Sequence, residues 1–347
     1  MRYKRILIWE VNWIGDVLFS MPFIKALRET FPEAHIACIT EPRCKEILEV
    51  NPNINEVILY DGKTVQKGIL KKLQLIALLR KKKFDVVFLL HRSLTRTLIC
   101  FLSGVKQRIG YSYRKRDFLL THKLKAPLTA QHRIERFVGL ARKIGADTRY
   151  AGLEFYMTDK DTAYIEQFLR NNGVTKKDRL VAINPGGNWN PKRWIVAKYA
   201  ELADILIKKL GVKVIVTGAE KDVDLYLAIQ EIMDEKLLSA CGKTTLRQLG
   251  ALFQKCDLVI SGDSGPLHIA LALKKKAVAL FGPTSPSVTG PYGDGDYVVL
   301  QKDLGCEIPC YNVKCNTQRC MDAIKVDELV LQVERMLHQG AKKKEAK

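Results

Sequence analysis

The sequence predicts an α/β protein of two Rossmann-like domains whose parallel sheets face each other across a cleft. Short apolar runs alternate with amphipathic segments along most of the 347 residues, which is the pattern of repeated β-α-β units. In the second half the apolar runs end in turns rich in Gly, Asp and Ser, namely NPGGN, TGAEKD, SGDSG and FGPTSP. Ligands of open α/β sheets bind outside such strand ends, so we expect the functional residues there.

The first half, residues 1–155, is predicted to form one domain. Its apolar runs predict strands and its segments with apolar residues every three to four positions predict helices. The expected strands are Ile6–Val11, His35–Thr40, Val57–Tyr60 and Asp85–Leu90, and the expected helices are Val17–Thr30, Cys44–Glu49, Gly68–Lys82 and Ile134–Ile144. The segment Lys106–His132 is basic and irregular, and we expect functional loops there.

Residues 156–325 are predicted to form a second domain with the same alternation. The expected strands are Leu180–Asn184, Val212–Thr217, Leu237–Ser239, Leu258–Ile260 and Ala277–Phe281, and the expected helices are Ile195–Leu210, Val223–Met233, Leu246–Lys255 and Leu267–Leu273. Residues 326–347 are predicted to add an amphipathic helix, Val326–His338, and a disordered basic tail, Lys342–Lys347.

The chain is strongly basic, with 57 Lys and Arg against 37 Asp and Glu, and residues 1–155 alone hold 29 basic and 14 acidic residues. Such a charge favours nucleic acid or an anionic partner such as a phosphorylated lipid at a membrane surface, or it serves solubility alone. The sequence contains no aromatic-interleaved RNA motif and no zinc-finger spacing. No apolar run is long enough to cross a membrane and no signal peptide is recognisable, so we expect a cytoplasmic protein.

Four of the nine cysteines, Cys306, Cys310, Cys315 and Cys320, form a C-x3-C-x4-C-x4-C cluster. Four thiols this close suit a structural metal, either a zinc ion or an iron–sulfur cluster. The cluster contains no CxxC pair, which weakens the indication of a metal, and disulfide pairs or free, packed thiols also fit the spacing. The other five lie mostly in apolar segments and are predicted to be buried.

The most informative turn is ISGDSGPLH, Ile260–His268. Pro266 opens a new apolar segment, which indicates a strand, a tight turn and a helix start. The free backbone N–H groups and the positive end of such a helix suit a diphosphate. Asp263 would repel phosphate but fits sugar hydroxyls, so the turn favours a sugar-nucleotide. His268, one turn into the helix, either donates a hydrogen bond to a phosphate or has a structural role.

Three further turns at strand ends carry charged residues. Asp16 is a candidate general base for an attacking hydroxyl, or else a helix N-cap. Lys192 and Arg193 are candidate cations for a leaving diphosphate, or else charges of a surface turn. Glu220 can accept hydrogen bonds from a ribose or a base, or else it caps a helix.

Three segments are similar to those of glycosyltransferase family 9, the ADP-heptose:lipopolysaccharide heptosyltransferases: GDVLFSMP with IKALRETFP, PGGNWNPKRW, and DSGPLH followed by ALFGPTSP. The chain resembles this family over nearly its whole length, and its heptosyltransferase II members most of all. The resemblance implies the GT-B fold, with the acceptor bound by the first domain and the sugar-nucleotide by the second. It also implies an inverting transfer that requires no metal and no other cofactor.

The resemblance further implies roles for individual residues. Asp16 resembles the catalytic base, and Lys192 the cation that stabilises the leaving ADP. The residues implied to bind the donor are Gly15, Gly187, Asn188, Arg193, Glu220 near the ribose and adenine, Asp263 at the sugar hydroxyls, and Ser264, Gly265 and His268 at the diphosphate. Some members carry hydroxyl side chains in place of Gly187 and Asn188, so the backbone is expected to contact phosphate there. The acceptor candidates, chosen by charge and position, are Arg92, Arg96, Arg114 and Arg116.

We therefore expect an inverting, metal-independent enzyme that moves heptose from ADP-heptose to the lipid A–Kdo inner core of lipopolysaccharide. It is expected to be a monomer, to bind no nucleic acid, and to work at the inner face of the cytoplasmic membrane. The alternatives are a GT-B transferase that uses another nucleotide sugar, a basic protein that binds nucleic acid or nucleotides without catalysis, and a metal protein organised by the Cys cluster.

Overall fold

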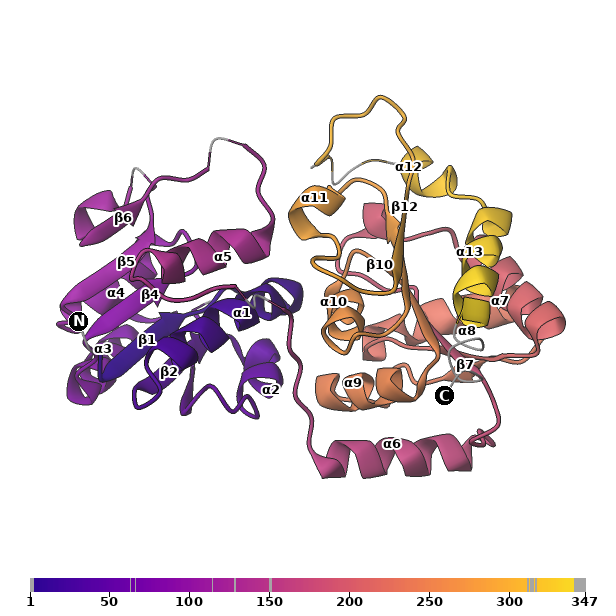
Figure 1. The fold of residues 1–347 in the computed structure, drawn as a ribbon, viewed down its shortest axis with the longest axis horizontal. Coiled ribbons are helices and arrows are strands. Elements are labelled where there is room, and N and C mark those ends of the chain that lie inside the picture. The colour runs from indigo at the N-terminus through magenta and orange to yellow at the C-terminus, as the bar shows by residue number, and fades with distance from the viewer. Residues whose placement is uncertain are drawn as a thin grey trace. The chain divides into compact units, whose positions relative to one another are not determined.

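The computed structural model describes residues 3–62, 64–65, 67–113, 115–127, 129–149, 152–310, 312, 315 and 317–339. It divides into two compact units, Met1–Tyr156 and Met157–Lys347. Each unit contains one six-stranded sheet in which every pair of neighbouring strands is parallel, with helices packed on it (Figure 1). The predicted α/β class with two parallel sheets is confirmed. Arg114 and the predicted basic tail lie outside the described residues.

The first unit has the strand order β3-β2-β1-β4-β5-β6. Its strands are β1 (Arg5–Trp9), β2 (His35–Thr40), β3 (Glu56–Leu59), β4 (Val86–Leu89), β5 (Gln107–Tyr111) and β6 (His122–Leu124). Its helices are α1 (Ile14–Thr30), α2 (Lys45–Leu48), α3 (Ile69–Lys82), α4 (Leu94–Leu102) and α5 (Arg133–Arg142). Helices α3 and α4 bury Leu79 and Ile99 in one core with Trp9. Helices α1 and α5 pack together on the other face, where Phe23 meets Phe88.

The expectation of irregular loops over Lys106–His132 is wrong for part of that segment, because β5 and β6 lie in it. Strand β5 reads QRIGY, and β6 is a short, mostly exposed strand at the sheet edge. Neither strand has the apolar alternation that identifies a half-buried strand in a sequence. Helix α4 was not predicted either.

The second unit has the strand order β12-β11-β10-β7-β8-β9. Its strands are β7 (Leu180–Asn184), β8 (Lys213–Val216), β9 (Leu238–Ser239), β10 (Leu258–Gly262), β11 (Ala277–Phe281) and β12 (Tyr297–Gln301). Its helices are α6 (Asp159–Asn171), α7 (Val196–Leu210), α8 (Val223–Ile232), α9 (Leu246–Lys255), α10 (Gly265–Ala272), α11 (Pro286–Thr289), α12 (Arg319–Asp322) and α13 (Val326–Gln339). Strands β7, β10 and β11 are fully buried, as expected of a parallel sheet covered on both faces. This unit contains a larger and a smaller apolar core, and the larger one contains residues of helices α7, α8 and α13.

Candidate functional site

The four sequence motifs of the second unit follow strands that are neighbours in its sheet. Strands β8, β7, β10 and β11 lie side by side in that order, and they end at Val216, Asn184, Gly262 and Phe281. Since the strands are parallel, the turns that follow them share one edge of the sheet. Asn184 joins two of these turns, because its amide donates to the carbonyl of Thr217 at 3.0 Å. This edge is the candidate donor site.

Lys192 and Asp263 meet at this edge although 71 positions separate them in the chain. Lys192 Nζ donates a hydrogen bond to Asp263 Oδ2 at 2.7 Å. Thr289 Oγ1 donates to the same oxygen at 3.3 Å, and His268 Nε2 lies 3.5 Å from Oδ1. Asp263 and His268 are buried, whereas the Lys192 side chain is 26% exposed. An ammonium group has three donors, so Lys192 retains hydrogen-bonding capacity on its exposed side.

The carboxylate of Asp263 is ionised in this environment. Burial by itself raises its pKa, but the hydrogen bond from His268 and the charge of Lys192 outweigh burial and hold the pKa well below its usual range. The family resemblance implies that Asp263 contacts sugar hydroxyls, whereas in the structure protein groups engage both of its oxygens. Here Asp263 positions the Lys192 ammonium, and its contact with a sugar stays a prediction.

Helix α10 begins next to this ion pair. Ser264 occupies its N-cap position without a side-chain capping bond, and Pro266 lies in its first turn. The Ser264 hydroxyl is instead 3.1 Å from Ser261 Oγ. The first N–H groups of a helix lack intrahelical partners and lie at the positive end of its dipole. The backbone from Ser264 and Gly265 is therefore suited to bind an anion.

Arg193 contacts the glycine turn after β7 in the structure, and its contact with the donor stays a prediction. Its guanidinium donates two hydrogen bonds to the carbonyl of Gly187, at 3.1 and 2.6 Å, and it lies 3.9 Å from Asp222 Oδ1. A Cβ added at Gly186 would come within 2.9 Å of that carboxylate, so only glycine fits this close approach. Arg193 therefore holds the glycine turn in place. Asn188 Oδ1 accepts a hydrogen bond from Lys221 Nζ, in the turn after β8.

Glu220 is exposed in the turn after β8, which leaves it available to a ligand. Its carboxylate lies against Gly242, in the turn after β9, and a Cβ added there would overlap it. Gly242 also has a φ of 69°, a value that favours glycine. No local sequence pattern connects the two turns, so this contact cannot be predicted from the sequence.

Asp16 lies in the first turn of α1, in the first unit. The N-cap position of this helix is Trp13, so the N-cap alternative for Asp16 does not apply. The Asp16 side chain is 17% exposed, and its Oδ1 lies 3.4 Å from Nη1 of Arg133, the first residue of α5. Arg133 is far from Asp16 in the chain, so no local pattern in the sequence indicates this partner. Gly15 belongs to this unit too, whereas the other residues predicted to bind the donor belong to the second.

Glu10 follows β1 and is fully buried close to Asp16. Ser20 Oγ donates to its Oε1 at 3.0 Å, while Oε2 has no hydrogen-bond partner among the described residues. Burial, with a smaller contribution from the charge of Asp16, raises the pKa of Glu10 to about 8. Glu10 is therefore mostly protonated at neutral pH.

Glu10→Gln is expected to stabilise the protein, and more at pH 8 than at pH 5. Between its ordinary pKa of 4.5 and about 8, the folded state keeps a proton that the unfolded state releases. Stability therefore falls as pH rises through this window, by up to about 1.4 kcal/mol per pH unit. Glutamine removes this loss. Urea unfolding at the two pH values measures the effect.

Glu56→Gln is the matched control for this effect. Burial raises the pKa of Glu56, but hydrogen bonds from Lys82 and His35 outweigh it and lower that pKa. The control should therefore lose rather than gain stability at neutral pH. An equal gain in stability from both substitutions would contradict the role assigned to burial at Glu10.

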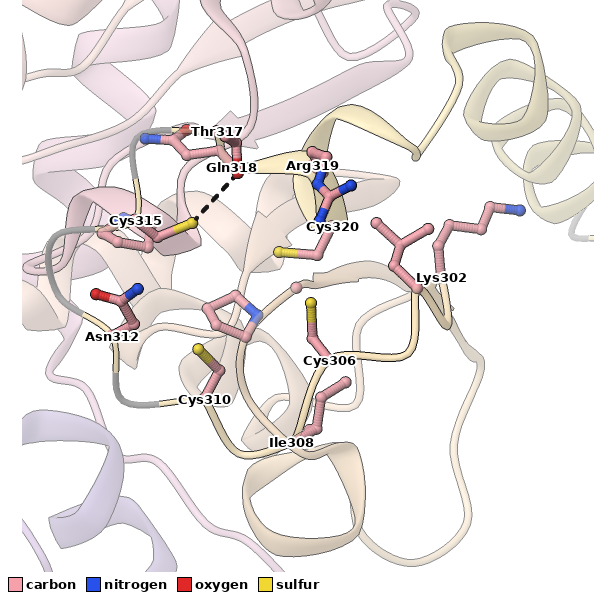
Figure 2. A pocket seen from close by; sticks show the side chains of 14 residues that line it. Lys302, Cys306, Ile308, Cys310, Asn312, Cys315, Thr317, Gln318, Arg319 and Cys320 are labelled. Carbon is pink, nitrogen blue, oxygen red and sulfur yellow. Dashed lines mark hydrogen bonds between the residues drawn. The ribbon is translucent and has the colours of Figure 1, made fainter.

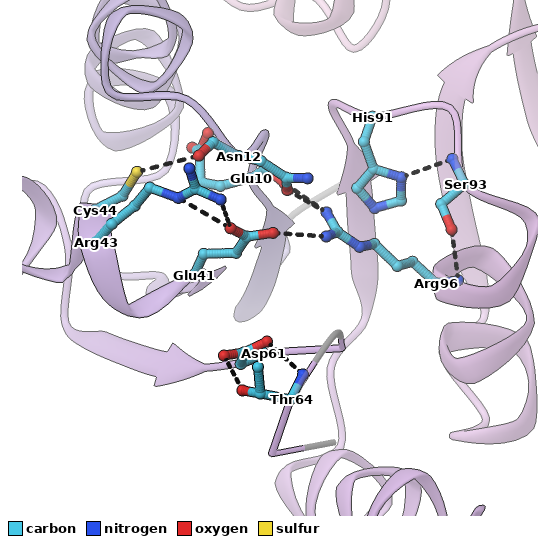
Figure 3. A network of polar contacts seen from close by, with 10 residues as sticks. All are labelled: Glu10, Asn12, Glu41, Arg43, Cys44, Asp61, Thr64, His91, Ser93 and Arg96. Carbon is cyan, nitrogen blue, oxygen red and sulfur yellow. Dashed lines mark hydrogen bonds and ion pairs between the residues drawn. The ribbon is translucent and has the colours of Figure 1, made fainter. Parts of the chain in front are cut away.

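Arg96, predicted to contact the acceptor, is engaged inside the first unit. It donates to Asn12 Oδ1 at 2.8 Å and lies 3.5 Å from Glu41 Oε1 (Figure 3). Its side chain is only 12% exposed. Arg96 therefore ties the turn after β1 to the end of β2, and its contact with an acceptor stays a prediction.

Arg116 also differs from its predicted role. It is 1% exposed and donates to the backbone carbonyls of His91 and Tyr111. Burial lowers its pKa to about 10. Arg92 is exposed and lies over the ring of Tyr113 at 4.4 Å. Of the three predicted acceptor arginines that the structure describes, only Arg92 is exposed, whereas Arg96 is partly buried and Arg116 is buried.

The four clustered cysteines line one pocket of about 260 Å³ in the second unit (Figure 2). All four are free thiols, so the disulfide alternative is not found. Within the described residues, no three His, Cys, Asp or Glu side chains are arranged to hold a metal ion. A structural metal at the cluster stays a prediction, which elemental analysis of the purified chain tests.

Three comparisons with known proteins agree with these observations. A family model described as glycosyltransferase family 9 (heptosyltransferase) matches residues 72–320. The chain is 28% identical over 305 residues to lipopolysaccharide heptosyltransferase 2 of Escherichia coli strain K12, covering 83% of this chain and 85% of that protein. It is 26% identical over 347 residues to the lipopolysaccharide core heptosyltransferase OpsX of Haemophilus influenzae, covering 96% and 97%.

Solved structures extend the likeness to the whole fold. A glycosyl transferase family 9 structure from Veillonella parvula is 26% identical, covers 98% of both chains, and superposes with a TM-score of 0.91. The structure of E. coli ADP-heptose LPS heptosyltransferase II is 24% identical, covers 97% of this chain and 99% of that one, and has a TM-score of 0.81. At 24% identity, the likeness to the E. coli structure shows a common fold and nothing further.

Proposed function

Because this chain belongs to glycosyltransferase family 9, we propose that it transfers heptose from ADP-heptose to the inner core of lipopolysaccharide, with inversion at the anomeric carbon. The family model covers residues 72–320. The observation that carries the proposal is the Lys192–Asp263 ion pair beside the start of α10. It combines an oriented cation with free helix N–H groups, as a departing nucleoside diphosphate requires.

The proposed reaction is a single displacement. The acceptor oxygen attacks the anomeric carbon of the donor and its proton passes to the Asp16 carboxylate. The bond from that carbon to the diphosphate oxygen breaks, and ADP leaves with the electron pair. Lys192 and the N–H groups at the start of α10 stabilise the charge that develops on the diphosphate. Arg133 lies 3.4 Å from Asp16 and forms an ion pair with the proposed base.

The acceptor is proposed to be the anionic, lipid-linked core, and the enzyme is proposed to act as a monomer at the membrane surface. The net charge of +15 in residues 1–155 supports an anionic partner for this part of the chain. Arg92 and its aromatic neighbour Tyr113 are the proposed acceptor contacts. In the described part of the chain, no helix is long and apolar enough to cross a membrane.

Product analysis with ADP-heptose and defined truncated cores tests the proposal, and we expect one heptose to be added with inverted configuration. In the same preparation, ADP should raise the melting temperature while UDP and GDP should not. A ligand at 100 times its Kd adds about 2.7 kcal/mol of stability. Stabilisation by UDP or GDP instead would favour a GT-B enzyme with another nucleotide sugar. Absence of both transfer and nucleotide binding would contradict the proposal.

A further inference from the structure

We propose that the outer face of α3 and α4 docks on the surface of an anionic lipid membrane. This inference rests on the proposed function, because it assigns the surface through which the enzyme would reach a lipid-linked acceptor. Eight large apolar side chains are exposed on these two helices, by 39% to 72%. They are Ile69, Leu70, Leu73 and Leu78 on α3, and Leu94, Leu98, Phe101 and Leu102 on α4. We call these eight residues the α3–α4 surface.

The two helices are neighbours on one face of the sheet. Both bury residues in the same core, Leu75 and Leu79 from α3 and Ile99 from α4, and they contact each other (Figure 1). Arg80 Nη2 of α3 donates to the carbonyl of Leu102 in α4 at 2.7 Å. Each helix is therefore apolar on its outer side as well as its inner side. A soluble protein rarely exposes so many large apolar residues on adjacent helices without a partner.

The charge of this part of the chain identifies the partner. Between Asp61 and Asp117 the sequence has 15 Lys and Arg and a single acidic residue, Asp85. This segment contains almost the whole charge excess of residues 1–155. The exposed basic side chains on α3 and at its two ends are Lys67, Lys71, Arg80, Lys81 and Lys83. Exposed leucines among lysines are the composition of a surface that inserts into the interface of an anionic bilayer.

A second copy of the chain fits this face less well. Pairing two copies would bring two strongly basic surfaces together, and like charges repel. A bilayer accepts both kinds of side chain at once, because the leucines enter the acyl boundary while the lysines pair with lipid phosphates. Asp16 lies in the first turn of α1, which packs on the opposite face of the sheet. Substitutions on the α3–α4 surface therefore leave the proposed base untouched.

The test measures sedimentation of the full chain with vesicles of phosphatidylcholine containing about one third phosphatidylglycerol. We expect Leu70→Glu/Leu73→Glu to lower the vesicle-bound to free ratio by at least roughly tenfold, because it removes inserted leucines and adds negative charge. The matched control is Leu227→Glu/Ile232→Glu on α8, where both residues are 54% exposed, and it should bind as the wild type does. About 0.5 M NaCl should weaken wild-type binding.

A transfer assay separates this inference from the proposed function. With a soluble, lipid-free core acceptor both variants should match the wild type, whereas with a lipid-linked acceptor in vesicles only the α3–α4 variant should slow. Unchanged vesicle binding by that variant would overturn the inference. The inference would also be overturned if the wild type failed to bind vesicles and instead formed a dimer, and if the same substitutions dissociated that dimer. If the wild type transfers no heptose but binds vesicles through this surface, the proposed function fails and the docking surface stands.

Discussion

Asp16→Asn is expected to lower kcat for heptosyl transfer by about 10²- to 10⁴-fold and to leave ADP binding nearly unchanged. Asparagine keeps the size of the side chain but cannot take the proton from the acceptor hydroxyl. Its partner Arg133 is 38% exposed, and such pairs contribute about 0 to 1 kcal/mol to stability, so the variant should fold. Steady-state transfer kinetics and ADP titration measure the two effects separately.

Glu135→Gln is the matched control for this substitution. Glu135 lies on α5 and pairs with Arg142 at 2.7 Å, with its side chain 25% exposed. It therefore resembles Asp16 in charge, exposure and arginine partner, but it has no proposed role in the reaction. We expect the control to keep wild-type transfer. Comparable activity of Asp16→Asn and Glu135→Gln would refute the assignment of Asp16 as the base.

Lys192→Met is expected to lower both kcat and stability. Loss of a preorganised charge at the leaving group typically lowers kcat by about 10²- to 10³-fold. The substitution also leaves the buried, ionised Asp263 without its cation. Removing one partner of a fully buried pair costs about 3–5 kcal/mol, and because Lys192 is 26% exposed we expect about 2–3 kcal/mol. Transfer kinetics and urea unfolding at pH 7 measure the two losses.

The double substitution Lys192→Met/Asp263→Asn separates the two effects. Without the carboxylate no buried charge is left unpaired, so stability should return toward the wild type while kcat stays low. Lys208→Met is the control, because its partner Asp234 is 2.6 Å away but 78% exposed, and the pair should contribute less than about 1 kcal/mol. If the double variant regained transfer together with stability, Lys192 would have a structural role only.

Local periodicity predicted the buried centre of the second sheet most accurately. Strands β7 and β11 have the predicted limits, because each is a run of apolar residues buried on both faces. Elements near the surface were missed. Edge strand β12 is only partly buried, and helix α6 carries several charges and buries few residues. Where only part of an element contacts the core, composition indicates its structure weakly.

For the candidate site, the sequence predicted which turns carry function better than it predicted what each side chain contacts. Arg96 and Arg116 were selected for their charge, yet both are held inside the first unit. A basic residue in a loop has the same appearance in a sequence whether it meets solvent or a backbone carbonyl. Only the packing of β4, β5 and their connections distinguishes Arg116 from the exposed Arg92.

By itself the sequence determined the α/β class, the order of most strands and helices, and the turns at the strand ends, since these depend on residues close together in the chain. The tertiary structure alone decided the pairing of Lys192 with Asp263 and of Asp16 with Arg133. It also decided that α3 and α4 expose apolar residues on the same side. The physical reason is that burial and ion pairing depend on distances between segments far apart in the sequence, which no local pattern records.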